Sequence, residues 1–342
     1  MPLWLSALPP PFRSPLNALA LLTSVSASLR LATLVVLSRT APRPERKARC
    51  AVSGDDARLF GRMQVFAKER RGRGEDAEGQ ARPPVAAFLM EECANEWRMA
   101  CEHAFVREMV GGTLPQEKFA RYLAQDFRFL DAFSKLLAAV LYAGAHNLEE
   151  RRFGASFLAL VTSEENDYFV ESFRALGVPA DAAARRRAYP DQPAADAFIA
   201  AMRSAADRAS AAPHEAVALL VVCEGAYQAW AEEALAIAVE KRGTKGDGSV
   251  QYVPRGRGKR PLPRHIARWI ELHSGEGFAK VVAYFKGLLD SIASRWSDEE
   301  APMRLAETRR SFVKTCMLEK AFWEMAYEEG SRGGGEKTAA LL

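Results

Sequence analysis

The chain has 342 residues, of which 49% are apolar and 26% charged, and its formal net charge is +4, so it is long enough to bury one large core or two small ones. Its five cysteines, at positions 50, 93, 101, 223 and 316, are an odd, scattered set without a Cys-x-x-Cys pair, which argues against a disulfide framework or a zinc site. The five histidines form neither His-Glu-x-x-His nor Glu-x-x-His, so we expect no metal and no other cofactor.

Residues 1–54 differ in composition from the rest of the chain. They contain seven Arg or Lys and a single acid, Glu45, among many Ser, Thr, Ala and Leu, which is typical of a transit peptide for a plastid or mitochondrion. Residues 16–37 are also apolar enough to suggest a secretory signal or membrane anchor, although Arg30 interrupts them. A misassigned start is a third interpretation, so secreted and cytoplasmic locations stay open. In the mature form we expect no membrane attachment.

Residues 55–83 read as a linker, because 68–82 are rich in Gly, Arg and Glu without an apolar period. A helical domain is predicted over 84–330, followed by a tail, 331–342, that is disordered by composition. No run in this domain shows the alternation typical of a strand, and helical periodicity covers eight stretches. The sequence therefore predicts an all-α bundle of seven or eight helices, at 84–110, 115–145, 147–176, 192–210, 213–242, 262–273, 276–296 and 300–328.

Residues 243–263 form a basic segment inside this helical pattern. Its arginines and lysines could attract phosphate or nucleic acid, but Tyr252 is the only aromatic side chain there that could stack on a base. A solvated loop is the preferred interpretation, and we expect no nucleic-acid partner.

Three acids fall on helix faces that are otherwise apolar. Asp126 lies in an aromatic stripe, four residues after Tyr122 and three before Phe129; Glu224 interrupts the almost wholly apolar segment 216–231, and Glu319 precedes Phe322 and Trp323. A carboxylate in such a place is costly unless it is paired. Either each acid has a private partner, with Arg98, Arg128 and Lys135 as candidates, or the three share one acidic site in which at least one carboxyl has a raised pKa.

Three motifs together resemble the TenA (thiaminase II) family over about 84–327. They are the helix-turn-helix with Gly111-Gly112 and Phe119-x-x-Tyr122-Leu-x-Gln125-Asp126, then Thr162-x-Glu164-x-x-x-Tyr168-Phe169, and finally Glu319-x-x-Phe322-Trp323. The resemblance implies a haem-oxygenase-like helical fold, a small aminopyrimidine as ligand, and a homodimer or homotetramer.

The resemblance also implies roles for individual residues. Asp126 matches the aspartate that bonds the exocyclic amine of the pyrimidine, and Glu319 matches the glutamate that contacts a ring nitrogen and moves protons. Tyr227 matches a tyrosine near the reactive group. Phe322 and Phe198 match aromatic walls of the ring pocket.

Two branches of that family differ in the reactive group. One uses a cysteine four residues before the tyrosine, where this chain has Cys223, and the other a glutamate three residues before it, where this chain has Glu224. Phe129 and His273 stand where the cysteine branch has tyrosines, which favours the glutamate branch. That branch is associated with hydrolysis of aminomethyl- and formylaminomethyl-pyrimidines in thiamine salvage.

The expected mechanism is hydrolytic. Asp126 orients the ring, Glu319 donates a proton, and Glu224 acts as base on water with Tyr227 steadying the developing charge. Thiamine cleavage through Cys223 is the alternative, but the neighbouring Glu224 would oppose ionisation of the thiol. Two other possibilities are a pyrimidine-binding protein without turnover and a haem protein in which His103 is the ligand.

Overall fold

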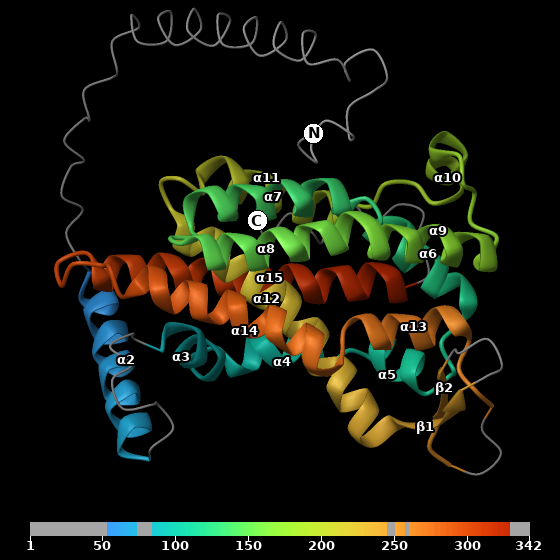
Figure 1. Cartoon of the computed structure of the whole chain (residues 1–342), viewed down its shortest axis with the longest axis horizontal. Helices are drawn as coiled ribbons and strands as arrows, with labels where there is room; N and C mark the ends of the chain where they lie inside the picture. Colours follow the sequence, from blue (N-terminus) through green and yellow to red (C-terminus); the bar gives the residue numbers. More distant parts are fainter. Residues whose placement is uncertain (1–52, 74–83, 245–249, 257–259, 329–342) are drawn as a thin grey trace, which may run out of the picture. The chain divides into compact units, whose positions relative to one another are not determined.

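Two long helices, α12 (Pro213–Glu233) and α15 (Ala301–Tyr327), run through the centre of the folded part (Figure 1). The computed structural model describes residues 53–73, 84–244, 250–256 and 260–328, all within one unit, Val52–Leu342. The predicted transit segment, apart from Ser53 and Gly54, and the predicted tail lie outside the described residues. None of the described helices is long and apolar enough to cross a membrane.

The apolar composition of α12 explains its central place. Fourteen of its residues are buried, and a helix that is apolar on all sides must be covered on all sides. It packs against α15 and against α14 (Gly275–Ala293), while α15 also contacts the helices of the N-terminal half. Helices α12 and α15 are therefore the two neighbouring core helices around which the domain packs.

The eight predicted helical stretches correspond to helices of the structure, but several are interrupted. Residues 84–110 form α3 (Val85–Glu92), α4 (Ala94–Cys101) and α5 (Ala104–Val110). Residues 115–145 form α6 (Gln116–Asp126) and α7 (Phe129–Ala143), and 147–176 form α8 (Leu148–Leu160), the π-turn η3 (Val161–Glu165) and α9 (Asn166–Leu176). After α9 come the helices α10 (Ala182–Ala188), α11 (Pro193–Arg208) and α13 (Arg264–Leu272), with α12, α14 and α15 as above. The all-α fold class is confirmed.

Two glycines that follow helices adopt the left-handed conformation that suits glycine. Gly112 has φ +68° in the turn between α5 and α6, and Gly177 has φ +69° at the end of α9. A Cβ on Gly112 would meet Leu262 and Pro254, each at 3.3 Å. Glycine at 112 thus also lets the chain segment after α12 pack closely on this turn.

The prediction of a helix to 242 followed by a solvated loop is wrong. The chain leaves α12 through a π-turn, η4 (Ala234–Ala238), and forms an antiparallel hairpin of β1 (Val239–Thr244) and β2 (Val250–Pro254). Tyr252 and Val253 are buried, and β2 contacts α13. The hairpin forms because these apolar side chains have a surface to cover. In the sequence, the surrounding Gly and Arg residues made the segment look like a solvated loop.

The prediction of a linker over 55–83 is also wrong for its first part, which forms helix α2 (Gly54–Gly72). Ser53 caps its first turn by accepting a hydrogen bond from the N–H of Asp56 at 3.1 Å. Leu59, Met63 and Phe66, at helical spacing, are buried, and α2 packs against α15 and α3. The apolar stripe outweighs the charged composition that suggested a linker.

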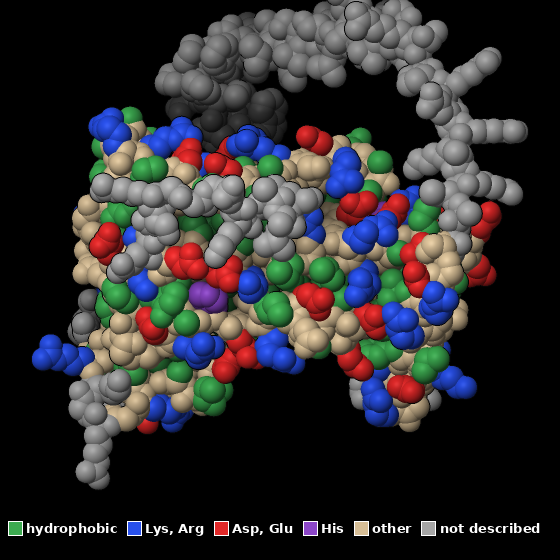
Figure 2. Space-filling view, turned by 180° about the vertical axis from the view of Figure 1, so that it is seen from behind, with side chains coloured by type: hydrophobic (Ala, Val, Ile, Leu, Met, Phe, Trp, Pro, Cys, Tyr) green, Lys and Arg blue, Asp and Glu red, His purple; other side chains and the backbone are tan. Residues whose placement is uncertain are grey.

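The surface of this domain carries both signs of charge. Figure 2 shows acidic and basic side chains interspersed over the face turned to the viewer. Many form ion pairs one helical turn apart, such as Lys135 with Asp131 at 2.7 Å and Lys280 with Glu276 at 2.7 Å. Such exposed pairs stabilise a fold only slightly, so the buried core and the site within it dominate the energetics.

Candidate active site

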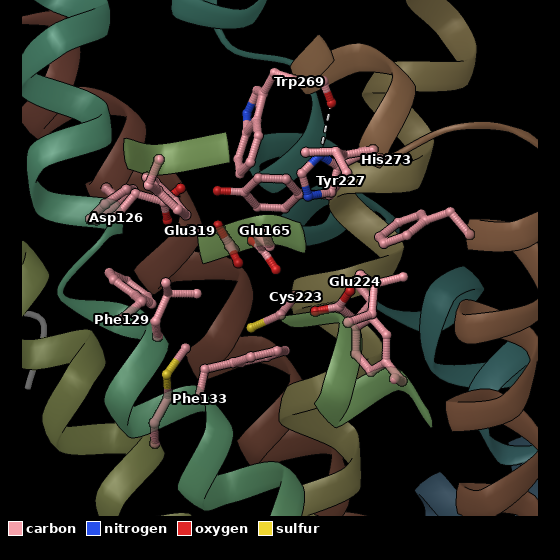
Figure 3. A pocket seen from close by; sticks show the side chains of 18 residues that line it. Asp126, Phe129, Phe133, Glu165, Cys223, Glu224, Tyr227, Trp269, His273 and Glu319 are labelled. Atoms are coloured by element: carbon pink, nitrogen blue, oxygen red, sulfur yellow. Dashed lines mark hydrogen bonds between the residues drawn. The ribbon is translucent and has the colours of Figure 1, made fainter. Parts of the chain in front are cut away.

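A pocket lies among α6, α7, α8, η3, α9, α11, α12, α13, α14 and α15 (Figure 3). Its wall meets the protein surface at Leu160, which is 39% exposed. The pocket joins residues from across the whole domain: Asp126, Phe129, Leu130, Phe133, Phe157, Leu160, Glu165, Phe169, Met202, Cys223, Glu224, Tyr227, Trp269, Leu272, His273, Phe278, Glu319 and Phe322.

Eight of the nine predicted site residues line this one pocket. They are Asp126, Phe129, Cys223, Glu224, Tyr227, His273, Glu319 and Phe322. The ninth, Phe198, does not line it. Phe198 is fully buried behind Phe129, and the two ring centroids are 4.9 Å apart at an interplanar angle of 81°. Phe198 therefore supports the wall instead of forming it.

Asp126 enters the pocket because α6 ends at that residue and the chain turns before α7. Arg128, in the turn, donates to the Gln125 side-chain oxygen at 3.0 Å and pairs with Asp196 at 2.6 Å, which fixes the direction of the chain. Burial raises the pKa of Asp126 to about 7, while the nearby Tyr122 hydroxyl opposes that rise. Asp126 is consequently poised between its neutral and ionised forms near neutral pH.

Cys223, Glu224 and Tyr227 come from α12. Cys223 and Glu224 are consecutive, so their side chains point about 100° apart on the helix. Both nevertheless line the pocket, which therefore extends around this face of α12. Glu224 is 8% exposed. Burial raises its pKa to about 8, and the charges of Glu319 and Asp126 add to that rise.

Glu319 comes from α15 and is 2% exposed. Burial holds its pKa well above the ordinary value, and the thiol of Cys223, hydrogen-bonded to it, opposes that rise. Burial, together with the charges of Glu319 and Glu224, holds the pKa of the Cys223 thiol well above its ordinary value. Cys223 is therefore a protonated thiol that donates to Glu319, and not a poised thiolate.

Two phenols connect the acids. The hydroxyls of Tyr122 and Tyr227 lie 2.8 Å apart, and burial keeps the pKa of each well above its usual range. Tyr227 faces the pocket, whereas Tyr122 lies behind it, near Asp126. The pair forms a hydrogen-bonded link from the Asp126 side of the pocket to α12.

His273 is a neutral imidazole with a defined hydrogen bond. Its Nδ1 lies 2.9 Å from the carbonyl oxygen of Trp269, the dashed line in Figure 3, and burial lowers its pKa to about 4. Because a carbonyl oxygen only accepts, Nδ1 carries the hydrogen and Nε2 is left as an acceptor. The ring packs 4.9 Å from that of Tyr227, so His273 brings an acceptor nitrogen to the wall beside this tyrosine.

The sequence-based reasoning missed a fourth acid, Glu165. It lies in the π-turn η3 and lines the pocket, and Figure 3 shows its carboxyl group among those of the other acids. Burial raises its pKa well above the ordinary value, with Glu224 and then Asp126 adding to the effect. A helical wheel with a uniform period cannot place Glu165 correctly, but the consecutive Thr162 and Ser163 were a signal for an irregular turn.

The described lining residues include four carboxyl groups and neither Lys nor Arg. Like charges in one buried pocket cannot all be ionised, so some of these groups hold protons at neutral pH. The result is a site with donors and acceptors placed between aromatic walls. Such a site suits a flat, neutral or cationic heterocycle that carries an amine.

In the described residues, donor atoms close enough to share a metal ion occur elsewhere, at His214, Glu215 and Glu307. His214 Nε2 lies 3.0 Å from Glu307, and burial lowers the pKa of His214 to about 4. Arg208 pairs with Glu215 at 3.0 Å and Arg304 with Glu307 at 3.5 Å. These arginines already neutralise both acids.

Residues 91–329 match the model of the TENA/THI-4/PQQC family. The chain belongs to this family. It is 24% identical over 246 residues to an aminopyrimidine aminohydrolase of Halalkalibacterium halodurans, covering 71% of this chain and 96% of that protein. It is 20% identical over 249 residues to an aminopyrimidine aminohydrolase of Helicobacter pylori, covering 71% and 99%.

Solved structures of TenA proteins share the fold of this family member. A TenA homologue of Pyrococcus furiosus superimposes with a TM-score of 0.52 at 20% identity, covering 71% of this chain and all of that one. A TenA family protein of Silicibacter sp. TM1040 gives a TM-score of 0.57 at 20% identity, covering 72% and 97%. Helix α2 and most of α3 precede the family match.

Proposed function

We propose that this TenA family member is an aminopyrimidine hydrolase of thiamine salvage. The observation that carries the proposal is the meeting of Asp126, Glu224 and Glu319, from three helices, in one pocket with the aromatic side chains of Phe129 and Phe322. The relatives named aminopyrimidine aminohydrolase support it. The substrates would be aminomethyl- or formylaminomethyl-pyrimidines.

Each acid has a distinct part in the proposed reaction. Asp126, ionised, accepts from the exocyclic amine of the pyrimidine, while Phe129 and Phe322 enclose the ring. Glu319, whose pKa is raised, is protonated at neutral pH and donates to the ring or leaving nitrogen. Glu224, whose pKa of about 8 leaves a fraction ionised at neutral pH, takes a proton from the attacking water in that ionised form. The Tyr227 hydroxyl stabilises the developing charge.

Thiamine cleavage through Cys223 is the second candidate for the same pocket. A nucleophilic thiol must ionise, yet Cys223 is 6% exposed, and burial and two neighbouring acids raise its pKa. A cation that would favour the thiolate is not among the described lining residues. The site therefore favours hydrolysis with Glu224 as base.

The test is incubation of the purified protein with aminomethylpyrimidine, formylaminomethylpyrimidine and thiamine, followed by mass spectrometry of the products. We expect the hydroxymethylpyrimidine from one or both of the first two. Glu319→Gln should lose turnover but still bind the pyrimidine. Binding by the wild-type protein without turnover of any of the three would instead identify a binding protein.

We also propose that the chain is imported into a plastid or mitochondrion and works as a homodimer or homotetramer. Composition supports the first, because residues 1–54 hold seven basic residues and one acid. Exposed apolar side chains support the second: Tyr142 and Leu148 are 82% and 80% exposed at neighbouring ends of α7 and α8. Organelle import assays and light scattering of the purified protein test the two proposals.

A further inference from the structure

Glu165 owes its position to an irregular turn in an otherwise continuous helix. From Leu148 to Leu176 the chain is helical throughout, but Val161–Glu165 form a π-turn, in which backbone N–H groups reach back five residues instead of four. Thr162 Oγ1 donates to the carbonyl of Leu158 at 2.9 Å, and Ser163 Oγ to that of Ala159 at 2.6 Å. These hydroxyls bond carbonyl groups at the wide turn and so stabilise it.

The π-turn separates two consecutive glutamates into different environments. Glu164 is exposed and lies 3.8 Å from Arg268, whereas Glu165 is half-buried and lines the pocket. Within the described residues, no hydrogen bond or ion pair engages the Glu165 carboxyl group. It is therefore free to bond a substrate or a water molecule.

Glu165 lines the same pocket as Glu224. The two lie on different helical segments, η3 and α12, and both line the cavity. Of the neighbouring charges, that of Glu224 has the largest effect in raising the pKa of Glu165. Two carboxyl groups that line one buried pocket do not both ionise readily, so one of them can hold a proton while the other serves as a base, as in other carboxyl pairs that perform acid–base chemistry.

We infer that Glu165 is a further catalytic carboxyl group, which acts together with Glu224 as the base that activates water. This inference rests on the proposed function and deepens it. The water oxygen forms a bond to the methylene carbon while its proton passes to the ionised member of the pair. The C–N bond breaks, its electron pair goes to the leaving nitrogen, and Glu319 donates a proton to that nitrogen. Aminomethylpyrimidine and water thus give hydroxymethylpyrimidine and ammonia.

The matched test compares Glu165→Gln with Glu164→Gln in the full chain, with aminomethylpyrimidine and formylaminomethylpyrimidine as substrates. Glu165→Gln should lower kcat by about 100-fold or more, the usual scale for a lost acid–base group, with little change in KM. Glu164→Gln should retain wild-type kcat. If the wild type is active and the kcat of Glu165→Gln lies within ~3-fold of the wild-type value, far below that scale, the inference is overturned. The proposed function would still stand.

A second variant separates a chemical role from a structural one. Glu165→Ala should regain part of its kcat when formate is added, because formate supplies a carboxylate in the vacated space, and Glu164→Ala should not respond. If circular dichroism shows a folded Glu165→Ala that formate does not rescue, Glu165 is not the base and the inference fails. Absence of turnover in the wild type would overturn both the inference and the proposed function.

Discussion

The buried carboxyl of Glu224 makes stability depend on pH in a calculable way. Burial and two acidic neighbours raise its pKa from the usual 4.5 to about 8. Between these values the folded protein holds a proton that the unfolded chain has lost, so stability falls as pH rises through this range. Integrated from pH 5 to pH 8.5, the loss is about 4 kcal/mol at ~1.4 kcal/mol per pKa unit.

Glu224→Gln removes this dependence, because glutamine cannot ionise. We expect the variant and the wild type to have similar free energies of unfolding at pH 5, and the variant to be more stable by up to about 4 kcal/mol at pH 8.5. Urea titrations of the ligand-free proteins, followed by circular dichroism at several pH values, measure this difference. A gain of that size is a large part of the ~5–15 kcal/mol that stabilises a typical domain.

Glu232→Gln is the matched control, since Glu232 lies on the same helix but is exposed. Its effect should stay within ~0.5 kcal/mol at every pH. Equal stability of Glu224→Gln and wild type at pH 8.5 would mean that Glu224 ionises without cost. The description of the pocket as a buried cluster of acids would then be wrong.

Three further substitutions test other parts of the structure. Cys223→Ser should keep hydrolysis of aminomethylpyrimidine, because the thiol is protonated, and loss of all turnover would point to cysteine chemistry. Gly225→Ala should lower the free energy of unfolding by ~1–3 kcal/mol, since a Cβ there would lie 2.8 Å from Trp97; urea titration measures it, and unchanged stability would contradict the tight contact. Met63→Ala in α2, where Met63 is 3% exposed, should lower the free energy of unfolding by ~2–5 kcal/mol. Val65→Ala, on the same helix but at a residue that is 58% exposed, should leave it almost unchanged. Equal urea midpoints for the two variants would contradict the packing of α2 against the rest of the domain.

The parts of the site that the sequence predicted are those that regular helices place. Asp126, Glu224 and Glu319 each interrupt an apolar face, and because apolar faces turn inward, the three acids could be expected in the core. Helix periodicity alone does not predict that the three acids meet in a single pocket; the family resemblance does. Phe198 shows the limit of such reasoning, because the sequence predicts that an aromatic residue is buried but not whether it lines the pocket or packs behind a residue that does.

The parts that sequence reasoning missed depend on local irregularity or on tertiary contacts. Glu165 reaches the pocket through a π-turn, which breaks the uniform helical period used for prediction. Tyr252 and Val253 form a strand only because tertiary contacts such as those of β2 with α13 give them a surface to cover. In helix α2, three apolar side chains lie among many charged residues. Their burial depends on contacts with α15, which is far away in the sequence.

The most direct test of the central claim is turnover of aminomethylpyrimidine in ¹⁸O-labelled water. If the pocket acids activate water for attack on the methylene carbon, the wild type will produce hydroxymethylpyrimidine with one ¹⁸O in its hydroxyl group, and Glu319→Gln will produce none. A wild-type protein that leaves aminomethylpyrimidine and its formyl derivative unchanged, while the pocket acids remain intact and the protein is folded, would contradict the account.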